Sequence, residues 1–347
     1  MDANVVLPLG SSILSLVFAI LLFDQWRERR RPYQLIWAVG MLWYGLSAGT
    51  EFLGGWQGWS EPLYRAWYLI GAVWVAAWLG LGTVYLLRRT RFGYAFAGSL
   101  FLAGLFTFLA QGRYQYENSG AAPYLYFAVA AVLAVAIVTL TARGSDRWAD
   151  LAGVVVVGGT LVSAALMATA SIPGFTPAAA VDPQTHIPTG ALLPGYLRLL
   201  TPFFNITGAF ALGLGALYSA YVFMPKRRAI RYSLAGGQSR GAYFRGLLLA
   251  AVAIPVNFVV SFPEAIRDLV RGRLNSRVPA TILIAVGALI PAYTSGLNRF
   301  GSTSGFFVGE LLGVVFLFLG YLVSIEVMPT IRVPFTRIVL RTREVQA

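Results

Sequence analysis

The chain has 347 residues, of which 57% are apolar and only 12% are charged, and its mean hydropathy is +0.68. A globular domain carries about a quarter charged residues, so this composition argues against a soluble protein and predicts an all-α, polytopic membrane protein. The net charge of +13 lies in short clusters between apolar runs. Nucleic-acid binding needs a basic face on a folded domain, so no nucleic-acid partner is expected.

The residue inventory argues against several cofactors and leaves the cofactor unknown. The chain has no cysteine, one histidine (His186), and one lysine (Lys226) that lies in a basic cluster. Cys-ligated clusters, a haem held by two histidines and a retinal Schiff base are therefore not expected. The spacing G-x-S-x-G occurs at 45–49, inside an apolar run, and at 237–241, but no H-E-x-x-H or phosphate-loop motif occurs, which argues against an enzyme.

Seven apolar runs are long enough to cross a bilayer as helices, and two more follow near the C-terminus. They cover residues 5–23, 34–54, 64–87, 93–110, 123–142, 149–171, 197–223, 279–297 and 306–327. The first run has no basic residue before it and is followed by the cluster Arg29-Arg30-Arg31. This charge order predicts an uncleaved anchor in the cell membrane (plasma or inner), with the N-terminus outside.

The segment 246–262 is ambiguous because it is apolar but contains Pro255 and Asn257. If it does not cross, all but four of the 27 basic residues fall on the cytoplasmic side, where anionic lipids are the expected partner. A crossing segment would make ten spans and turn the basic C-terminus outward. Nine spans are therefore predicted, with a cytoplasmic C-terminus and with 246–262 re-entrant or along the inner interface.

This count divides the chain into three parts. Residues 1–225 are expected to form a seven-helix bundle, and residues 226–278 a cytoplasmic, basic segment that is partly interfacial or re-entrant. Residues 279–347 are expected to form a two-span C-terminal part with a basic tail.

The third and seventh spans suggest an internal repeat. A shift of 133 residues superposes the LGLG run at 79–82 on that at 212–215, Arg65 on Arg198, and Tyr85 on Tyr218. Two parallel three-helix units joined by the fourth span would explain the match. The alternative is chance similarity between glycine-rich packing helices. The three-one-three layout of the first 225 residues resembles the SWEET and PQ-loop families in topology. The Pro-Gln dipeptide is absent, and the resemblance assigns no residue roles.

Charged residues inside spans are costly and therefore suggest a functional site. Glu310 lies about one turn inside the last span, and Glu51 lies near the outer end of the second. Glu51 is expected to pair with Arg65, and Arg65 and Arg198 would offer two cations to an anionic ligand. The alternative reading makes these residues interfacial anchors and salt bridges between helices.

Two further groups are candidates for a ligand site. Arg198, Thr201 and Asn205 share one face of the seventh span, which fits either a pocket wall or polar helix packing. Trp74 and Trp78 lie on an aromatic stripe of the third span. Such a stripe forms either a cage for a cation or ordinary core packing.

Two functional hypotheses follow from these patterns. The first is a carrier or permease-like protein whose first seven helices surround a small-molecule pocket that opens outward. The second is a non-transporting membrane subunit, such as a sensor, assembly or accessory protein, that binds other membrane proteins. The depth of the polar groups distinguishes them, because a carrier needs a site near the middle of the membrane. In this sequence the strongest charges lie towards the outer ends of the spans, which counts against active transport.

Overall fold

A computed structural model describes residues 2–233, 240–299, 303, 305–324, 330–332, 334–336 and 339–342. The helices are α1 (Ala3–Arg29), α2 (Pro32–Gln57), α3 (Glu61–Trp67), the π-helix η1 (Tyr68–Trp74), α4 (Val75–Leu86), α5 (Gly93–Tyr114), α6 (Ala122–Ala142), α7 (Arg147–Thr169), α8 (Gly195–Phe223), α9 (Arg240–Val270), α10 (Arg277–Arg299) and α11 (Phe306–Val323). Two short strands, β1 (Thr330–Arg332) and β2 (Val339–Thr342), pair antiparallel.

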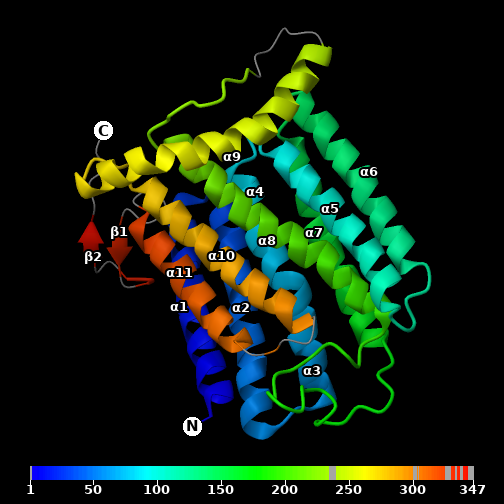
Figure 1. Cartoon of the computed structure of the whole chain (residues 1–347). Helices are drawn as coiled ribbons and strands as arrows, with labels where there is room; N and C mark the ends of the chain where they lie inside the picture. The colour runs from blue at the N-terminus through cyan, green and yellow to red at the C-terminus, as the bar shows by residue number, and fades with distance from the viewer. Residues whose placement is uncertain are drawn as a thin grey trace.

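The chain is a polytopic helical membrane protein, and most of its long helices run side by side (Figure 1). Nine helical segments of the described residues are long and apolar enough to span a membrane, and α9 is one of them. The 26-residue α2 is less apolar and is not among the nine, yet it packs between α1 and α4. With α2 counted and α9 set aside, the helices along the bundle coincide with the nine predicted runs.

Helix α9 lies across one end of the bundle instead of running along it (Figure 1). It is continuous over 31 residues, with Pro255 and Pro263 inside it, so segment 246–262 is not a broken re-entrant element. We call the end of the bundle that α9 crosses the α9 end. The opposite end carries the N-terminus and the connection 170–194 between α7 and α8, and we call it the loop end.

Side chains along α9 attach this helix to the segment that follows α8 and to α10. Its Asn257 amide donates to the carbonyl of Ile230 (2.8 Å), and Ser261 accepts from the backbone N–H of Arg227 (2.9 Å). Ala265 packs with Met224, which follows α8, and with Val278 in α10. The opposite face of α9 is apolar and exposed at Phe244, Leu248, Val252, Val259, Ile266 and Val270.

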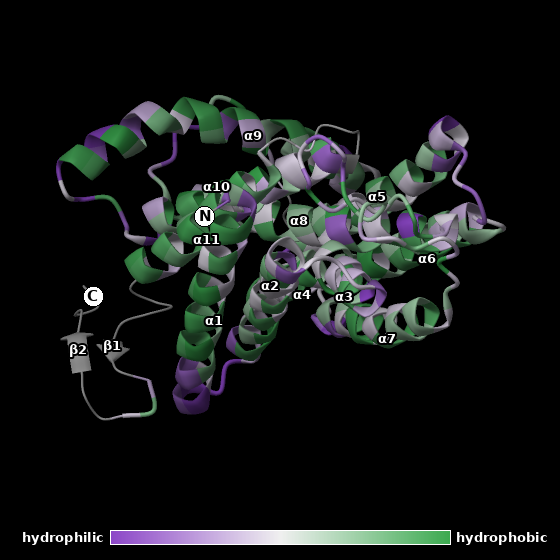
Figure 2. Cartoon of the chain, turned by 90° about the horizontal axis from the view of Figure 1, so that it is seen from below, coloured by the Kyte–Doolittle hydropathy of each residue, from purple (hydrophilic) through white to green (hydrophobic). Residues whose placement is uncertain are grey.

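The outer surfaces of the bundle are apolar, as expected for helices that contact lipid. Val132 and Val135 in α6, and Val154 and Leu161 in α7, are among the most exposed large side chains. Figure 2 shows hydrophobic residues around the outside of the helices, with hydrophilic residues mainly at helix ends and loops.

The centre of the bundle is a close crossing of α4 and α8 at glycines. A Cβ atom added at Gly208 would lie on the backbone of Ala76, and one added at Gly80 would meet the Gly208 carbonyl oxygen. Towards the loop end, Thr201 donates to the Tyr68 hydroxyl (2.9 Å). Small residues bring helix backbones together in this way in membrane proteins.

We expect Gly208→Ala to destabilise the protein by about 1–3 kcal/mol, because the new methyl group overlaps the backbone of α4. The matched control is Gly98→Ala in α5, where an added Cβ atom has no neighbour within 4 Å. Thermal unfolding in detergent measures both variants. Equal midpoints would show that the crossing is not tightly packed.

Candidate functional site

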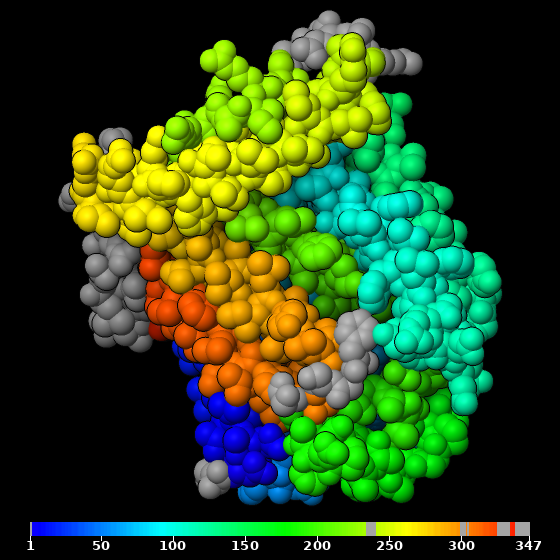
Figure 3. Space-filling view, in the orientation of Figure 1, coloured from blue at the N-terminus to red at the C-terminus, as the bar shows by residue number. Residues whose placement is uncertain are grey.

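The largest cavity towards the loop end has a volume of about 300 Å³. It lies between α3–η1, α5, α8, α10, α11 and residues 189–191, and Figure 3 shows a hollow between α5 and α10 with α8 at its floor. Its lining contains charged, amide and aromatic side chains, chiefly Glu51, Trp67, Tyr68, Phe106, Tyr114, Tyr116, Arg198, Asn298, Phe306 and Glu310. The cavity is therefore polar on some walls and aromatic on others.

Two glutamates from distant parts of the chain meet in this cavity. Glu51 is only 1% exposed, and its Oε1 accepts a hydrogen bond from Trp67 Nε1 (2.8 Å). The Glu310 carboxyl lies within hydrogen-bonding reach of the Glu51 carboxyl. In the described structure, Oε2 of each glutamate is buried without a donor. Two carboxylates this close repel each other unless a proton or a cation lies between them.

The positions of the two glutamates in their helices explain why they meet. Glu51 lies near the C-terminal end of α2 and Glu310 near the start of α11, so both reach a similar depth from the loop end. The Tyr44 hydroxyl of α2 donates to the Glu310 carbonyl (2.8 Å) and so ties the two helices together. Among the described residues, no group of three or more His, Cys, Asp or Glu is placed to hold a metal ion.

Another wall of the cavity carries a guanidinium group. Arg198, in the first turn of α8, stacks over the Tyr116 ring at 4.2 Å from its centroid. No carboxylate of the described residues lies within ion-pair distance of it. Nearby, the Asn298 amide donates to the Pro188 carbonyl (3.3 Å), while its Oδ1 is buried without a donor. The cavity thus combines three acceptor oxygens that lack donors with a cation that lacks a carboxylate.

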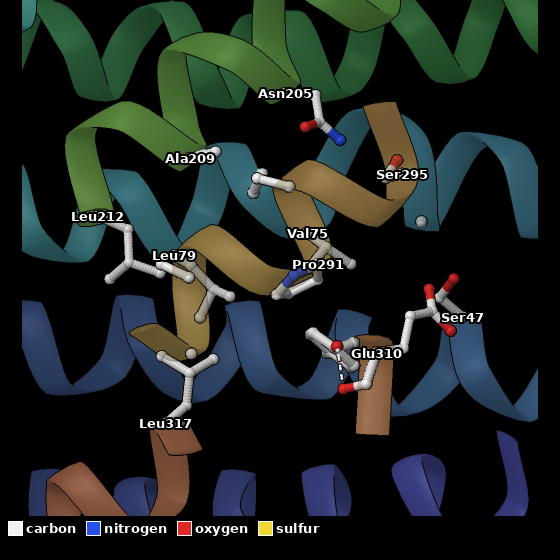
Figure 4. A pocket seen from close by; sticks show the side chains of 16 residues that line it. Ser47, Val75, Leu79, Asn205, Ala209, Leu212, Pro291, Ser295, Glu310 and Leu317 are labelled. Atoms are coloured by element: carbon white, nitrogen blue, oxygen red, sulfur yellow. Dashed lines mark hydrogen bonds between the residues drawn. The ribbon is translucent and has the colours of Figure 1, made fainter. Parts of the chain in front are cut away.

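A second cavity of about 80 Å³ adjoins the first and shares Gly71, Ser295 and Glu310 with it. Apart from those shared residues and Tyr44, Ser47 and Asn205, its walls are apolar and include Leu79, Leu212 and Leu317. Figure 4 shows Asn205 and Glu310 on different sides of this space. Glu310 therefore lies on the boundary between an outer polar cavity and an inner, mostly apolar one.

The π-helix η1 borders both cavities. It interrupts the third span between Tyr68 and Trp74, and π-helical turns occur frequently at functional sites. Gly71 lies at its middle, where a Cβ atom would collide with the Ser47 hydroxyl. The Asn205 amide reaches the Ala72 carbonyl at 3.4 Å. The irregular backbone is thus placed beside the polar side chains of α2 and α8.

The structure separates several residues that the sequence analysis grouped. The prediction that Glu51 pairs with Arg65 is wrong. Arg65 instead forms an ion pair with Glu61 (2.6 Å) and donates to the carbonyls of Met167 and Ala170 at the end of α7. Glu51, Arg198 and Glu310 meet in the outer cavity.

The remaining candidates divide between the inner cavity and helix packing. Asn205 lines the inner cavity, whereas Thr201 is buried against Tyr68. Trp74 and Trp78 donate to Ser163 (2.9 Å) and Thr160 (3.1 Å), and so anchor the third span to α7. Neither tryptophan lines the two cavities at this site. A cage formed by these two side chains is therefore not supported.

Sequence reasoning missed Trp67 as a donor to Glu51, Asn298 on α10 and the stacking of Tyr116 on Arg198. One available signal was the similar depth of Glu51 and Glu310 in two spans of opposite direction. Comparison with protein-family models, curated proteins and solved structures yields no match. The functional interpretation therefore depends on the geometry of the cavity.

We expect Arg65→Ala to lower the unfolding free energy by about 1–3 kcal/mol, because the guanidinium donates to two carbonyls of α7. Glu61→Ala should cost only about 0.5 kcal/mol, since Glu61 contributes an exposed ion pair within one helix. Thermal unfolding measures both. Because Glu51 has other partners, Glu51→Ala and Arg65→Ala should be additive; a strong coupling between them would contradict this arrangement.

Proposed function

We propose that this chain is a carrier whose outer cavity opens to the outside and binds a small zwitterion of about amino-acid size. The supporting observation is that one cavity of about 300 Å³ contains acceptor oxygens without donors and the Arg198 guanidinium without a carboxylate partner, as far as the described residues are concerned. An ammonium group has three N–H donors, which match Oε2 of Glu51, Oε2 of Glu310 and Oδ1 of Asn298. A carboxylate would accept two parallel hydrogen bonds from Arg198.

Charge balance also favours a zwitterion over a simple anion or amine. One proton shared by Glu51 and Glu310 leaves the pair with a single negative charge. That charge and the positive charge of Arg198 complement a ligand that carries one charge of each sign. The aromatic walls supply ring faces that favour an ammonium group.

The inner cavity supports transport rather than binding alone. It extends from Glu310 past Asn205 to Leu79, Leu212 and Leu317. Transporters place their sites near the middle of the membrane, beside irregular helix segments, and η1 is such a segment. Closure of the outer cavity and widening of the inner one would move a ligand past Glu310.

The contacts of the third span with α8 also support the proposed duplication. The pairs Tyr68–Thr201 and Ala72–Asn205 are each separated by the 133 residues of the sequence repeat. Equivalent residues touch in this way when two parallel units are related by an axis between them. The flanking helices differ, because α1 packs along α2 whereas α6 packs mainly on α5. We infer that any duplication is retained best in these two central spans.

Ligand binding tests the proposal directly. The common amino acids are added to the purified protein, each beside its decarboxylated amine and its deaminated acid, and thermal unfolding is recorded. We expect one or more zwitterions to stabilise the protein, and Glu310→Gln to weaken that binding at least tenfold. Arg198→Gln should remove the preference for the zwitterion over the amine. Glu117→Gln, an exposed change at the same end, is the control.

Uptake by proteoliposomes then separates the two functional hypotheses. Accumulation of the stabilising zwitterion identifies a carrier, whereas binding without flux favours the non-transporting subunit. If every amine binds as well as its zwitterion in the wild type, Arg198 has no role in recognition. If no zwitterion binds at all, the proposed function is wrong.

Orientation is tested by single cysteines, because the chain has none of its own. We expect a cysteine at Ser276, near the α9 end, to react with an impermeant maleimide only after the cell membrane is opened. A cysteine at Gln184, which is exposed in the loop, should react in intact cells. The reverse labelling pattern would place the cavity on the cytoplasmic side.

A further inference from the structure

A second, larger cavity lies at the α9 end and is separate from the carrier site. Its volume is about 1010 Å³. Three elements surround it: the connection from α4 to α5, the connection from α6 to α7, and the start of α9. Its lining includes Arg88, Arg89, Arg91, Arg143, Asp146 and Tyr243. We call this space the arginine groove.

Positive charge dominates the arginine groove. Of the described lining residues, four are arginines and one is a carboxylate, Asp146, whose Oδ2 is 3.9 Å from Arg88 Nε. Arg91 lies over the Tyr243 ring, at 5.5 Å from its centroid. Arg89 and Arg143 are exposed, and no described carboxylate lies within ion-pair distance of either. The lining therefore carries an excess of about three positive charges.

The backbone places these arginines firmly and adds to the positive potential. Trp148 Nε1 donates to the Arg88 carbonyl (3.0 Å), which fixes the α4–α5 connection against α7. The N-termini of α5 and α7 both lie at this end. Their helix dipoles favour an anion there. A phosphate group, which binds arginine through parallel hydrogen bonds, suits such a site.

The rest of the groove is apolar, which an inorganic ion does not require. Val138 of α6 and Phe244 of α9 line the space with exposed side chains, and Leu248 is exposed one turn further along α9. The start of α9 is held to α5 by a hydrogen bond of 2.8 Å between the Tyr94 and Tyr243 hydroxyls. An apolar wall beside a cationic one fits a ligand with a phosphate head and a hydrocarbon chain.

We propose that the arginine groove binds an anionic phospholipid. The phosphate lies among Arg89, Arg91 and Arg143, and an acyl chain lies between α6 and the apolar face of α9. Basic pockets between spans on the cytoplasmic side bind lipid headgroups in this way. The bound lipid would contact the start of α9 and the N-terminal ends of α5 and α7. This inference is independent of the carrier cavity, since the two sites share no residue.

The test uses the full-length protein in detergent, with phosphatidylglycerol as the probe and phosphatidylcholine as the neutral lipid. Native mass spectrometry measures lipid retention, and thermal unfolding measures stabilisation. The variant is Arg89→Gln with Arg143→Gln, which removes two exposed charges and no side-chain hydrogen bond among the described residues. The matched control is Arg271→Gln with Arg273→Gln, near the other end of α9, where both arginines are also exposed. A third arm adds inorganic phosphate as a competitor.

We expect the wild type and the control to retain phosphatidylglycerol over phosphatidylcholine. The Arg89/Arg143 variant should bind it roughly 30-fold more weakly, since each arginine near an anionic lipid contributes about fivefold. Equal retention by the variant and the control would overturn the site, as would equal binding of the neutral lipid. Displacement of the lipid by millimolar inorganic phosphate would overturn the lipid assignment in favour of a soluble phosphate compound.

Discussion

The close crossing of α4 and α8 is the constraint on which the rest of the structure depends. Gly80 and Gly208 have no side chains, so the backbones of α4 and α8 come into direct contact there. This contact fixes the distance between the two helices at the crossing. Towards the loop end, the third span and α8 are joined through side chains instead, by the hydrogen bond from Thr201 to the Tyr68 hydroxyl. The π-helix η1 adds an irregular segment to the third span directly after Trp67. The outer cavity occupies the space that this combination leaves between the third span, α8 and α10.

The two carboxyl groups in the outer cavity are expected to destabilise the folded protein. The bundle places Glu51 and Glu310 together, where the described residues offer Glu51 one indole N–H and leave one carboxylate oxygen of each glutamate without a donor. A buried polar group without a partner costs about 1–3 kcal/mol. A helix bundle built for stability alone would have apolar residues at these positions. The unmatched acceptors are best understood as a surface that a ligand completes.

The sequence was sufficient to predict the fold class because each span carries its own signal. About twenty apolar residues predict a crossing helix, and each predicted run lies on a helical segment of the described structure. All of these runs except 34–54 are long and apolar enough to span a membrane. Glu51 and Glu310 were recognised individually, since a carboxylate inside an apolar run is conspicuous. Their pairing was not predicted, because it depends on how α2 and α11 pack, and helix packing has no local signature. Arg65 was assigned to Glu51 for the same reason, although Glu61 lies four residues away on the same helix turn. The π-helix was also missed, since no residue pattern distinguishes it from an α-helical run.

The two ends of the bundle differ in the partners that their polar groups lack. This difference indicates whether the proposed ligand of each site comes from water or from the membrane. In the loop-end cavity, buried acceptor oxygens of Glu51, Asn298 and Glu310 have no donor among the described residues, so a ligand that reaches them must leave water and fit a cavity of about 300 Å³. At the α9 end the arginines are numerous, exposed and in excess, and an apolar helix face continues the groove. A soluble zwitterion matches the first environment and a lipid of the surrounding membrane matches the second. Helix α9 contributes to both environments. Its exposed apolar face is suited to contact with lipid, and its inner face packs on the bundle that contains the outer cavity.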